Sequence, residues 1–447
     1  MQKRMRSFLV LAMLFFVIAV NAQVTTASMG GKVVDATNEP LIGATVRAVH
    51  NPTGTVYNTI TQSNGQYRFQ NLRIGGPYTV EFSYVGFNPE KVSNINLVLG
   101  EDRTLNVVMK EDAQALGEVL VVADRSSVIS KNRTGAQEII TRDKMDKMPS
   151  LSHSLTDFTK LTPMSSGNNF AGTSYRFNNV TVDGASFNNS FGLSSSLGAA
   201  GTEPISLEAL EQVQVMIAPY DVRNGAFTGA GINSVTKSGS NQWHASAYMY
   251  TKSPSMTGYR QKDDINTVTE FSNHQYGISL SGPIIKNKLF FYLNGEMDRQ
   301  EKPVNYKPRA TKNDEVTGEF SFADAQTLEQ LSQFLQTKFD YNPGTYNVGS
   351  IPTEADRITA RVDWNINQKN TLSVKYFYLK SFATNSPSTS GAPTNGRGAN
   401  AYAIPFSSCY YRTNNNFNIV MADLVTNIND RMSNTLKVGY SALRDYR

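Results

Sequence analysis

The sequence is poor in the residues that usually carry covalent or metal chemistry. Its 447 residues include one cysteine, Cys409, and four histidines, which are His50, His153, His244 and His274. A single cysteine excludes an internal disulfide. None of the histidines has a His-x-x-Glu or His-Glu-x-x-His spacing, and no pairing of a nucleophile with a base is recognisable. We therefore expect neither an enzyme nor a bound cofactor.

The sequence also lacks a strong excess of charge. It has 42 lysines and arginines against 37 aspartates and glutamates, a net charge of +5. The basic residues are scattered rather than gathered into a stripe, so the sequence does not indicate a nucleic-acid partner.

Long apolar runs are missing after the first residues. Lys3, Arg4 and Arg6 form a basic start, Phe8–Val20 is apolar, and small residues precede Gln23. This pattern is typical of a signal peptide over residues 1–22. The alternative, a membrane anchor, needs about 20 apolar residues. The mature chain is therefore expected to be exported, and any part that crosses a membrane must do so as strands closed into a barrel.

Residues 28–110 contain short apolar stretches separated by turn residues, which predicts a small β-sandwich. Tyr67, Tyr78, Tyr84 and Phe87 are predicted to belong to its core. The expected strands are Gly31–Asp35, Ile42–Val49, Val56–Thr61, Gln66–Phe69, Tyr78–Tyr84 and Leu105–Met109.

The middle of the chain mixes helix and strand patterns. A helix is predicted over Ser150–Leu161, with Leu151, Leu155, Phe158 and Leu161 on one face. Further along, Phe177, Val180 and Val182 are expected to be buried before a turn at Asp183-Gly184. Ser190–Ala200 is expected to be a flexible loop.

The stretch Ser206–Gly239 marks the main boundary of the chain. Ser206 is predicted to cap a short helix, and Val213, Val215 and Ile217 alternate as in a strand. A turn rich in glycine, with Gly225, Gly229 and Gly231, leads to an exit strand over Ile232–Lys237. No Gly-Lys-Ser/Thr motif surrounds these glycines, so they do not form a phosphate loop.

After Trp243 the sequence alternates between apolar and polar residues. Examples of apolar rows are Tyr276, Ile278 and Leu280; Ile358, Val362 and Trp364; and Leu436, Val438 and Tyr440. The pattern breaks near Asp423, where we expect a bulge.

The connections between these strands alternate strictly between short and long. The short ones are Pro283–Asn287, Asn367–Asn370 and Asn429–Met432, and the long ones are Lys252–Asn273, Arg299–Ala355 and Ser381–Asn415. Outer-membrane barrels show this alternation. A short amphipathic helix is expected within the longest loop, over Asp324–Lys338.

Several motifs, in this order along the chain, resemble those of TonB-dependent outer-membrane receptors of the Oar-like type. The first motifs resemble a carboxypeptidase regulatory-like domain: Gly30-Gly31-Lys32-Val33-Val34-Asp35 and Asn64-Gly65-Gln66-Tyr67-Arg68-Phe69. The later motifs are Asn178-x-x-x-Val182-Asp183-Gly184, Ile232-Asn233-x-x-Thr236-Lys237-x-Gly239 and the turn Ser281–Phe291. The chain departs from the usual pattern after Gly184, where Ala185-Ser186-Phe187 stands instead of a proline.

The resemblance implies a mainly β protein with an N-terminal sandwich, an α+β plug domain and the first strands of an incomplete transmembrane antiparallel β-barrel. The implied segments are the signal peptide 1–22, the sandwich 28–110, a TonB-box-like linker 113–124, the plug 125–239 and the barrel part 240–447. The residues that would bind a TonB-like protein are Glu118, Val119, Leu120, Val121, Val122 and Ala123. Those that would shape the plug are Arg176, Asp183, Gly184, Gly225, Gly229 and Gly231. A plain first strand of the plug is the alternative for the stretch from Leu116 to Ala123.

The function implied is an outer-membrane receptor or transporter, energised by a TonB-like protein, in contact with outer-membrane lipid and with an extracellular substrate that the sequence does not identify. The alternative is surface adhesion or carbohydrate binding through the sandwich, which has a carbohydrate-binding-like fold. Seven strands are expected after the plug, whereas plugged transporters have barrels of about 22. We therefore expect the sequence to be the N-terminal part of a longer protein and unable to form a transporting pore alone.

Overall fold

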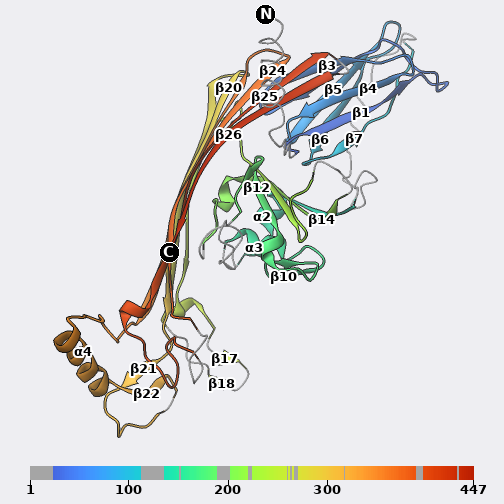
Figure 1. Ribbon diagram of the computed structural model, residues 1–447. Coiled ribbons are helices and arrows are strands. Elements are labelled where there is room, and N and C mark those ends of the chain that lie inside the picture. Colours follow the sequence, from blue (N-terminus) through green and yellow to red (C-terminus); the bar gives the residue numbers. More distant parts are fainter. Residues whose placement is uncertain are drawn as a thin grey trace, which may run out of the picture.

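The computed structural model describes residues 24–111, 135–150, 153–188, 202–219, 224–258, 260–261, 264–265, 270–316, 318–388, 396–429 and 432–447. The predicted signal peptide, the TonB-box-like linker 113–124 and the loop Ser190–Ala200 lie outside these residues. The described chain is mainly β and has three parts: a sandwich domain (24–111), a central domain (135–239) and a long curved sheet (244–446) (Figure 1).

The sandwich domain consists, in its described residues, of two four-stranded sheets, β4-β1-β7 with β8 also on β1, and β3-β2-β5-β6. Its strands are β1 (Ala27–Val34), β2 (Thr45–His50), β3 (Thr55–Ile60), β4 (Gln66–Leu72), β5 (Gly75–Ser83), β6 (Glu90–Leu97), β7 (Asp102–Thr104) and β8 (Val107–Val108). Tyr67 and Tyr78 are buried in the core, and Tyr84 and Phe87 pack against it, which confirms their predicted positions. The sequence did not predict β6, an edge strand in which only Ile95 and Leu97 are fully buried.

The central domain surrounds a five-stranded sheet of order β13-β12-β15-β14-β9, as far as the described residues go. Its elements are β9 (Gly135–Thr141), α2 (Arg142–Lys147), α3 (Leu155–Thr159), β10 (Ser165–Ser166), β11 (Asn169–Phe170), η1 (Tyr175–Phe177), β12 (Asn179–Val182), β13 (Ala185–Ser186), η2 (Leu207–Ala209), β14 (Leu210–Pro219) and β15 (Gly231–Thr236). The predicted cap at Ser206, the strand at Val213 and the exit strand at Ile232 are confirmed.

Two predictions in this domain are wrong. The helix expected over Ser150–Leu161 is only the five-residue α3, because His153 has a positive φ of 48° and Pro163 disfavours helical geometry at Thr162. Leu161 therefore leaves the apolar face and is 54% exposed. Phe177, expected to be buried, is 55% exposed because it lies in the 3-10 helix η1, before β12 begins.

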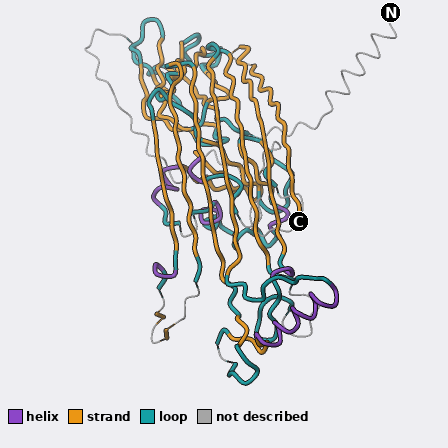
Figure 2. The backbone as a smooth tube through the Cα atoms, turned by 90° about the vertical axis from the view of Figure 1, so that its left-hand side faces the viewer, coloured by secondary structure: helices purple, strands orange, loops and turns teal. Residues whose placement is uncertain are grey.

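The long sheet is an antiparallel meander that, over the described residues, has seven strands in the order β16-β19-β20-β23-β24-β25-β26. Its strands are β16 (His244–Lys252), β19 (Ser272–Ile285), β20 (Leu289–Pro303), β23 (Ser350–Asn365), β24 (Asn370–Asn385), β25 (Tyr411–Asn429) and β26 (Met432–Tyr446). The short connections all lie at one end and the long ones at the other (Figure 2), as predicted. The bulge expected near Asp423 is not at this residue, which pairs in register with β24 and β26; the register shift of β25 lies a few residues further on, between Asn427 and Asn429.

The two faces of the long sheet reverse the usual arrangement of a soluble protein. Apolar residues point away from the rest of the molecule, and Ile278 and Val438 are 66% and 60% exposed. Charged and polar residues on the opposite face, among them Arg357, Arg361 and Asp363, are buried under the central domain. An apolar outer surface with a polar interior is typical of outer-membrane strands, and the predicted alternation is confirmed.

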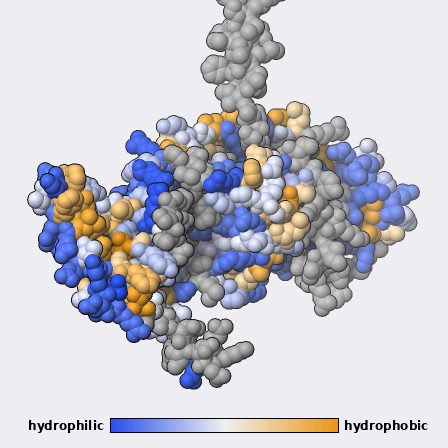
Figure 3. Space-filling view, turned by 60° about the horizontal axis from the view of Figure 1, so that its bottom comes forward, coloured by the Kyte–Doolittle hydropathy of each residue, from blue (hydrophilic) through white to orange (hydrophobic). Residues whose placement is uncertain are grey.

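The long connections form a lobe at one end of the long sheet. The helix α4 (Ala325–Phe339) confirms the predicted amphipathic helix, with Asp324 as its N-cap. Figure 3 shows apolar side chains on this lobe, where Leu331, Phe334 and Phe339 are exposed. The remaining elements of the connections are η3 (Pro254–Met256), β17 (Arg260–Gln261), β18 (Asp264–Ile265), β21 (Lys307–Arg309), β22 (Phe320–Asp324) and η4 (Ser407–Cys409). No helix in the described residues is both long and apolar enough to cross a bilayer.

Candidate functional site

The candidate site is the buried polar contact between the central domain and the inner face of the long sheet. Asp183 lies at its centre, in the turn between β12 and β13, with a positive φ of 52°. Its carboxylate is fully buried and accepts a hydrogen bond of 2.5 Å from Thr236 Oγ1 on β15. The turn thus places a negative charge on the side of the central domain that faces the long sheet.

Two strands of the long sheet provide cations for this charge. Arg361 Nη1 on β23 lies 3.8 Å from Asp183 Oδ1 and donates to the carbonyl oxygen of Thr236 at 2.9 Å. Lys375 Nζ on β24 lies 3.6 Å from Asp183 Oδ1 and 2.7 Å from Asp423 Oδ2. Because an unpaired charge is very unfavourable in a buried site, these contacts fix the position of the central domain on the sheet.

A second buried cluster lies farther along the same face and is centred on Glu296 of β20. Glu296 accepts hydrogen bonds from Arg357 Nη1 at 2.6 Å, Ser206 Oγ at 2.6 Å and Tyr248 OH at 2.7 Å. Arg357 also donates through Nε to the backbone oxygen of Glu203 at 2.7 Å. Ser206 is the predicted cap of η2, so the start of this stretch is held by the long sheet.

A third cluster surrounds Glu208 in η2. Its carboxylate lies 2.8 Å from Arg142 Nη2, 3.5 Å from His153 Nε2 and 3.6 Å from Lys237 Nζ. Burial alone would raise the pKa of the Glu208 carboxyl, but the hydrogen bond from His153 and the charge of Arg142 lower it to about 2. His153 in turn bonds Gln275 of β19 at 3.0 Å and stacks on Tyr250 of β16.

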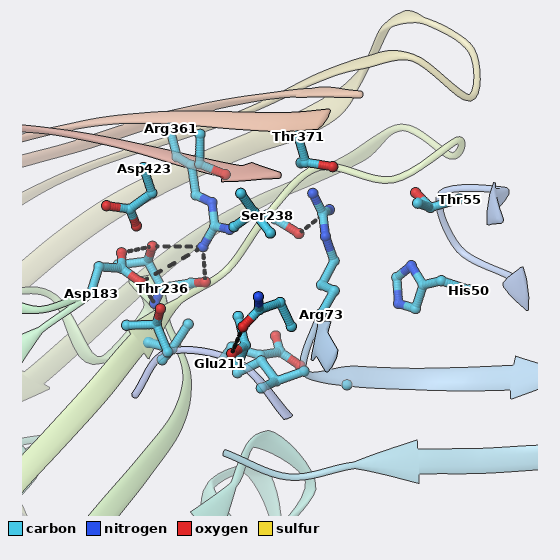
Figure 4. A pocket seen from close by; sticks show the side chains of 18 of the residues that line it. His50, Thr55, Arg73, Asp183, Glu211, Thr236, Ser238, Arg361, Thr371 and Asp423 are labelled. Carbon is cyan, nitrogen blue, oxygen red and sulfur yellow. Dashed lines mark hydrogen bonds and ion pairs between the residues drawn. The ribbon is translucent and has the colours of Figure 1, made fainter. Parts of the chain in front are cut away.

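The sandwich domain reaches the same region through Arg73. Its Nη1 donates to Ser238 Oγ at 3.2 Å (Figure 4). Its Nη2 lies 3.5 Å from Asp363 Oδ1. Residues of all three parts of the chain line a partly open cavity of about 230 Å³ at this point. Burial, and to a lesser extent the charge of Arg73, lower the pKa of His50 on the cavity wall to about 3, so His50 is neutral at physiological pH.

Among the predicted plug-shaping glycines, Gly229 and Gly231 are closely packed against side chains, and Gly184 has a positive φ. A Cβ at Gly229 would lie 2.4 Å from Asn178 Oδ1, and one at Gly231 would lie 2.6 Å from the ring of Phe227. Gly184 has a φ of 89°, a conformation that favours glycine. A Cβ added at Gly225 would have no atom within 4 Å. The backbone oxygen of Gly225 accepts a hydrogen bond from the Asn179 side chain.

The other predicted site residues do not join these clusters. Arg176 is exposed, with its guanidinium 5.9 Å from the centre of the Tyr175 ring. The stretch from Glu118 to Ala123 lies outside the described residues.

Sequence reasoning missed the partners of Asp183 on the long sheet. The apolar row Ile358, Val362 and Trp364 of β23 was named from the sequence, but Arg361, Asp363 and Lys375 were not singled out as partners. The signal that could have found them is a charged residue on the polar face of a strand whose other face is apolar, because that polar face has to be covered by another part of the chain.

Comparison with known proteins defines the class of two parts of the chain. Residues 28–110 match the family described as carboxypeptidase regulatory-like domain, and residues 235–446 match the family described as outer membrane beta barrel domain. Along the chain, a region that matches regulatory-like domains is therefore followed by one that matches outer-membrane barrel domains. The protein is located in the outer membrane.

The relatives narrow this class further. The chain is 29% identical over 282 residues to the TonB-dependent transporter Oar of Myxococcus xanthus, which covers 59% of this chain and 26% of Oar. It is 30% identical over 149 residues to the TonB-dependent receptor SusC of Bacteroides thetaiotaomicron, which covers 33% of this chain and 13% of SusC. The chain is thus a homologue of TonB-dependent outer-membrane receptors and spans about a quarter or less of the length of these two relatives.

Solved structures show a weaker similarity. The outer-membrane transporter YddB of Escherichia coli aligns with a TM-score of 0.45 at 12% identity, covering 69% of this chain and 39% of YddB. The relatives named above are receptors and transporters rather than enzymes.

Proposed function

We propose that the protein is a TonB-dependent outer-membrane receptor or transporter, which binds or takes up a substrate at the cell surface without changing it chemically. The observation that carries this proposal is the long sheet, whose outer face is apolar and whose polar inner face is covered by a separate α+β domain. A domain held by buried charges against the polar face of lipid-facing strands is the arrangement that a plugged barrel requires.

In this proposal, residues 125–239 are the plug and residues 240–447 are part of the barrel wall. The lobe of long connections faces the cell exterior, and the short turns face the periplasm. Substrate binds to the lobe and to the neighbouring surface of the plug. Arg176 is exposed on that domain, whereas Asp183 and the glycines Gly184, Gly229 and Gly231 maintain its shape and its contact with the wall.

A TonB-like protein is the proposed energy source, and its binding segment is Glu118–Ala123 within the linker 113–124. Extended segments bind partner sheets through their backbone, so this contact depends little on side-chain identity. The segment is directly followed along the chain by the plug. A pull on it is therefore transmitted to β9, an edge strand of the plug sheet.

The test compares proline and alanine at the same positions. Val119→Pro with Val121→Pro removes two backbone donors, whereas Val119→Ala with Val121→Ala keeps them. We expect the proline pair to abolish capture of the protein by a purified TonB-like periplasmic domain and the alanine pair to retain it. Equal capture of both variants would contradict the assignment of this segment and favour the plain first strand of the plug.

Surface adhesion or carbohydrate binding through the sandwich domain is less well supported. The domain lies at the end with the short turns, opposite the lobe, and its tyrosines Tyr67 and Tyr78 are buried in its core. Binding of glycans by the intact protein that survives removal of the lobe would favour this alternative.

A further inference from the structure

The sandwich domain is seated on the short-turn end of the long sheet. Asn365 Nδ2, at the end of β23, donates to Thr55 Oγ1 at 2.8 Å, and Ser433 Oγ on β26 donates to Gln70 Oε1 at 2.6 Å. The backbone nitrogen of Asn241 donates to the Pro52 carbonyl at 2.7 Å. These contacts spread over several strands, so the domain covers this end rather than touching it at one point.

The same domain also contacts the plug-like central domain. The buried side chain of Gln212 on β14 accepts a hydrogen bond from the Leu99 backbone nitrogen at 2.8 Å and donates to the Leu97 carbonyl at 3.3 Å. Asn233 Nδ2 on β15 donates to the Val24 carbonyl at 2.8 Å. The sandwich domain therefore bridges the central domain and the long sheet.

The cavity of about 230 Å³ lies beneath this bridge. On one side it is lined by the sandwich residues His50, Thr55 and Arg73, and on the other by Arg361 and Thr371 of the long sheet (Figure 4). Removing the sandwich domain would take away one wall and open the space between the central domain and the sheet at the short-turn end.

The ion pair between Arg73 and Asp363 can break with only a small loss of free energy. Asp363 keeps two hydrogen bonds from Arg361, at 2.9 and 3.0 Å, and one from Ser373 at 2.5 Å when Arg73 leaves. No charge is then left buried without a partner, and Arg73 regains water. The rest of the interface is mainly polar, with Val235 of β15 as the apolar residue buried against the sandwich core. Largely polar interfaces are typical of domains that separate.

We propose that the sandwich domain is a releasable gate with Arg73 as its latch. Docked, it forms one wall of the cavity and restricts access to it from the short-turn end; undocked, it leaves the space between the central domain and the long sheet open on that side. The gate does not depend on how a TonB-like protein binds, so its test is separate from that of the proposed function.

The first test measures access to the cavity in outer-membrane preparations of the protein. Thr371→Cys is introduced with Cys409→Ser, and its labelling by a polar maleimide is timed. We expect Arg73→Ala to increase the labelling rate roughly tenfold, because a hydrogen-bonded charged contact is lost. Arg47→Ala, which breaks the exposed pair with Glu81 elsewhere on the same domain, is the control and leaves the rate unchanged. An equal rate with and without Arg73 would overturn the latch.

The second test measures docking directly and does not rely on Thr371. Thr55→Cys with Asn365→Cys, again in Cys409→Ser, is expected to cross-link with a short bifunctional maleimide. Lys91→Cys with Asn365→Cys is the control, because Lys91 is on β6 at the opposite edge of the sheet from β3, and it should not cross-link. Failure of the Thr55 pair, or equal yield from both pairs, would overturn the docked gate.

Discussion

The central domain and the sandwich domain both pack against the long sheet, but by different means. The central domain shares an apolar core with the sheet, in which Phe187 packs edge-on against Phe377 and Phe417, and it buries the charge of Asp183 there. The sandwich domain has its own core and meets the sheet mainly through hydrogen bonds and the Arg73–Asp363 pair. One contact is part of the folded core, and the other is a docking surface.

The largest expected effect is on the central domain. Asp183→Ala leaves Lys375 and Arg361 with one fewer carboxylate in a buried site and should destabilise the contact with the sheet by about 3 kcal/mol. The measurement is the urea midpoint of the detergent-solubilised protein, followed by hydrogen exchange of β12 and β15. Asp183→Asn should lose less, because the amide still accepts a hydrogen bond from Thr236. A midpoint within error of the wild type would show that the charge does not anchor the domain.

The next largest expected effect is a loss of stability around Glu208 at low pH. The pKa of Glu208 in the folded protein is about 2, below its ordinary value of 4.5. The ionised carboxylate therefore contributes to the free energy of unfolding above about pH 4.5, and this contribution is lost as the pH falls towards 2. The difference corresponds to at most about 3 kcal/mol of stability, and solvent screening of this partly exposed carboxylate makes the contribution smaller. Hydrogen exchange of η2 and α3 between pH 5 and 2 measures it, over the range set by these two values. Glu208→Gln should be less stable at neutral pH and should lose this part of the acid dependence; an unchanged profile would contradict the role of Glu208.

A smaller effect is expected where the sandwich meets the central domain. Gln212→Leu leaves the buried backbone nitrogen of Leu99 without its acceptor, which should weaken docking by about 1–2 kcal/mol. The measurement is faster exchange of the Leu99 amide, with unchanged exchange in the core of β2. Faster exchange throughout the sandwich domain would instead mean that the domain itself unfolds.

The smallest effect is expected on the exposed surface of the sandwich domain. Arg47→Ala breaks the pair with Glu81, whose two side chains are both largely in water, and should change stability by less than about 1 kcal/mol. Thermal unfolding of the variant measures this. A larger loss would mean that the surface pairs of this domain are as important as the buried pairs of the central domain.

The sequence predicted those features that depend on near neighbours along the chain. The row Tyr276, Ile278, Leu280 follows from the two-residue repeat of a strand, and the short turn at Asn429–Met432 follows from its polar residues. The helix α4 was likewise predicted from its periodicity.

The sequence could not predict features that depend on residues far apart. Asp183 and Lys375 meet only because β12 and β24 lie face to face, and no local pattern encodes this. Asp423 appeared to break the strand pattern for the same reason: its partner Lys375 lies on the neighbouring strand. Phe177 was judged by its hydrophobicity alone, whereas its exposure depends on where η1 ends and β12 begins.

The contacts of Arg361 restrict how the central domain can move. This guanidinium is fixed on its own strand by Asp363 and at the same time holds the main-chain oxygen of Thr236. If the central domain slid along the strands by one side-chain repeat, about 6.8 Å, Thr236 would lie opposite a different residue of β23. Asp183 would then lose its contacts with Arg361 and Lys375. Any displacement of the central domain along the long sheet therefore has to break the contacts of Arg361 and Lys375 first.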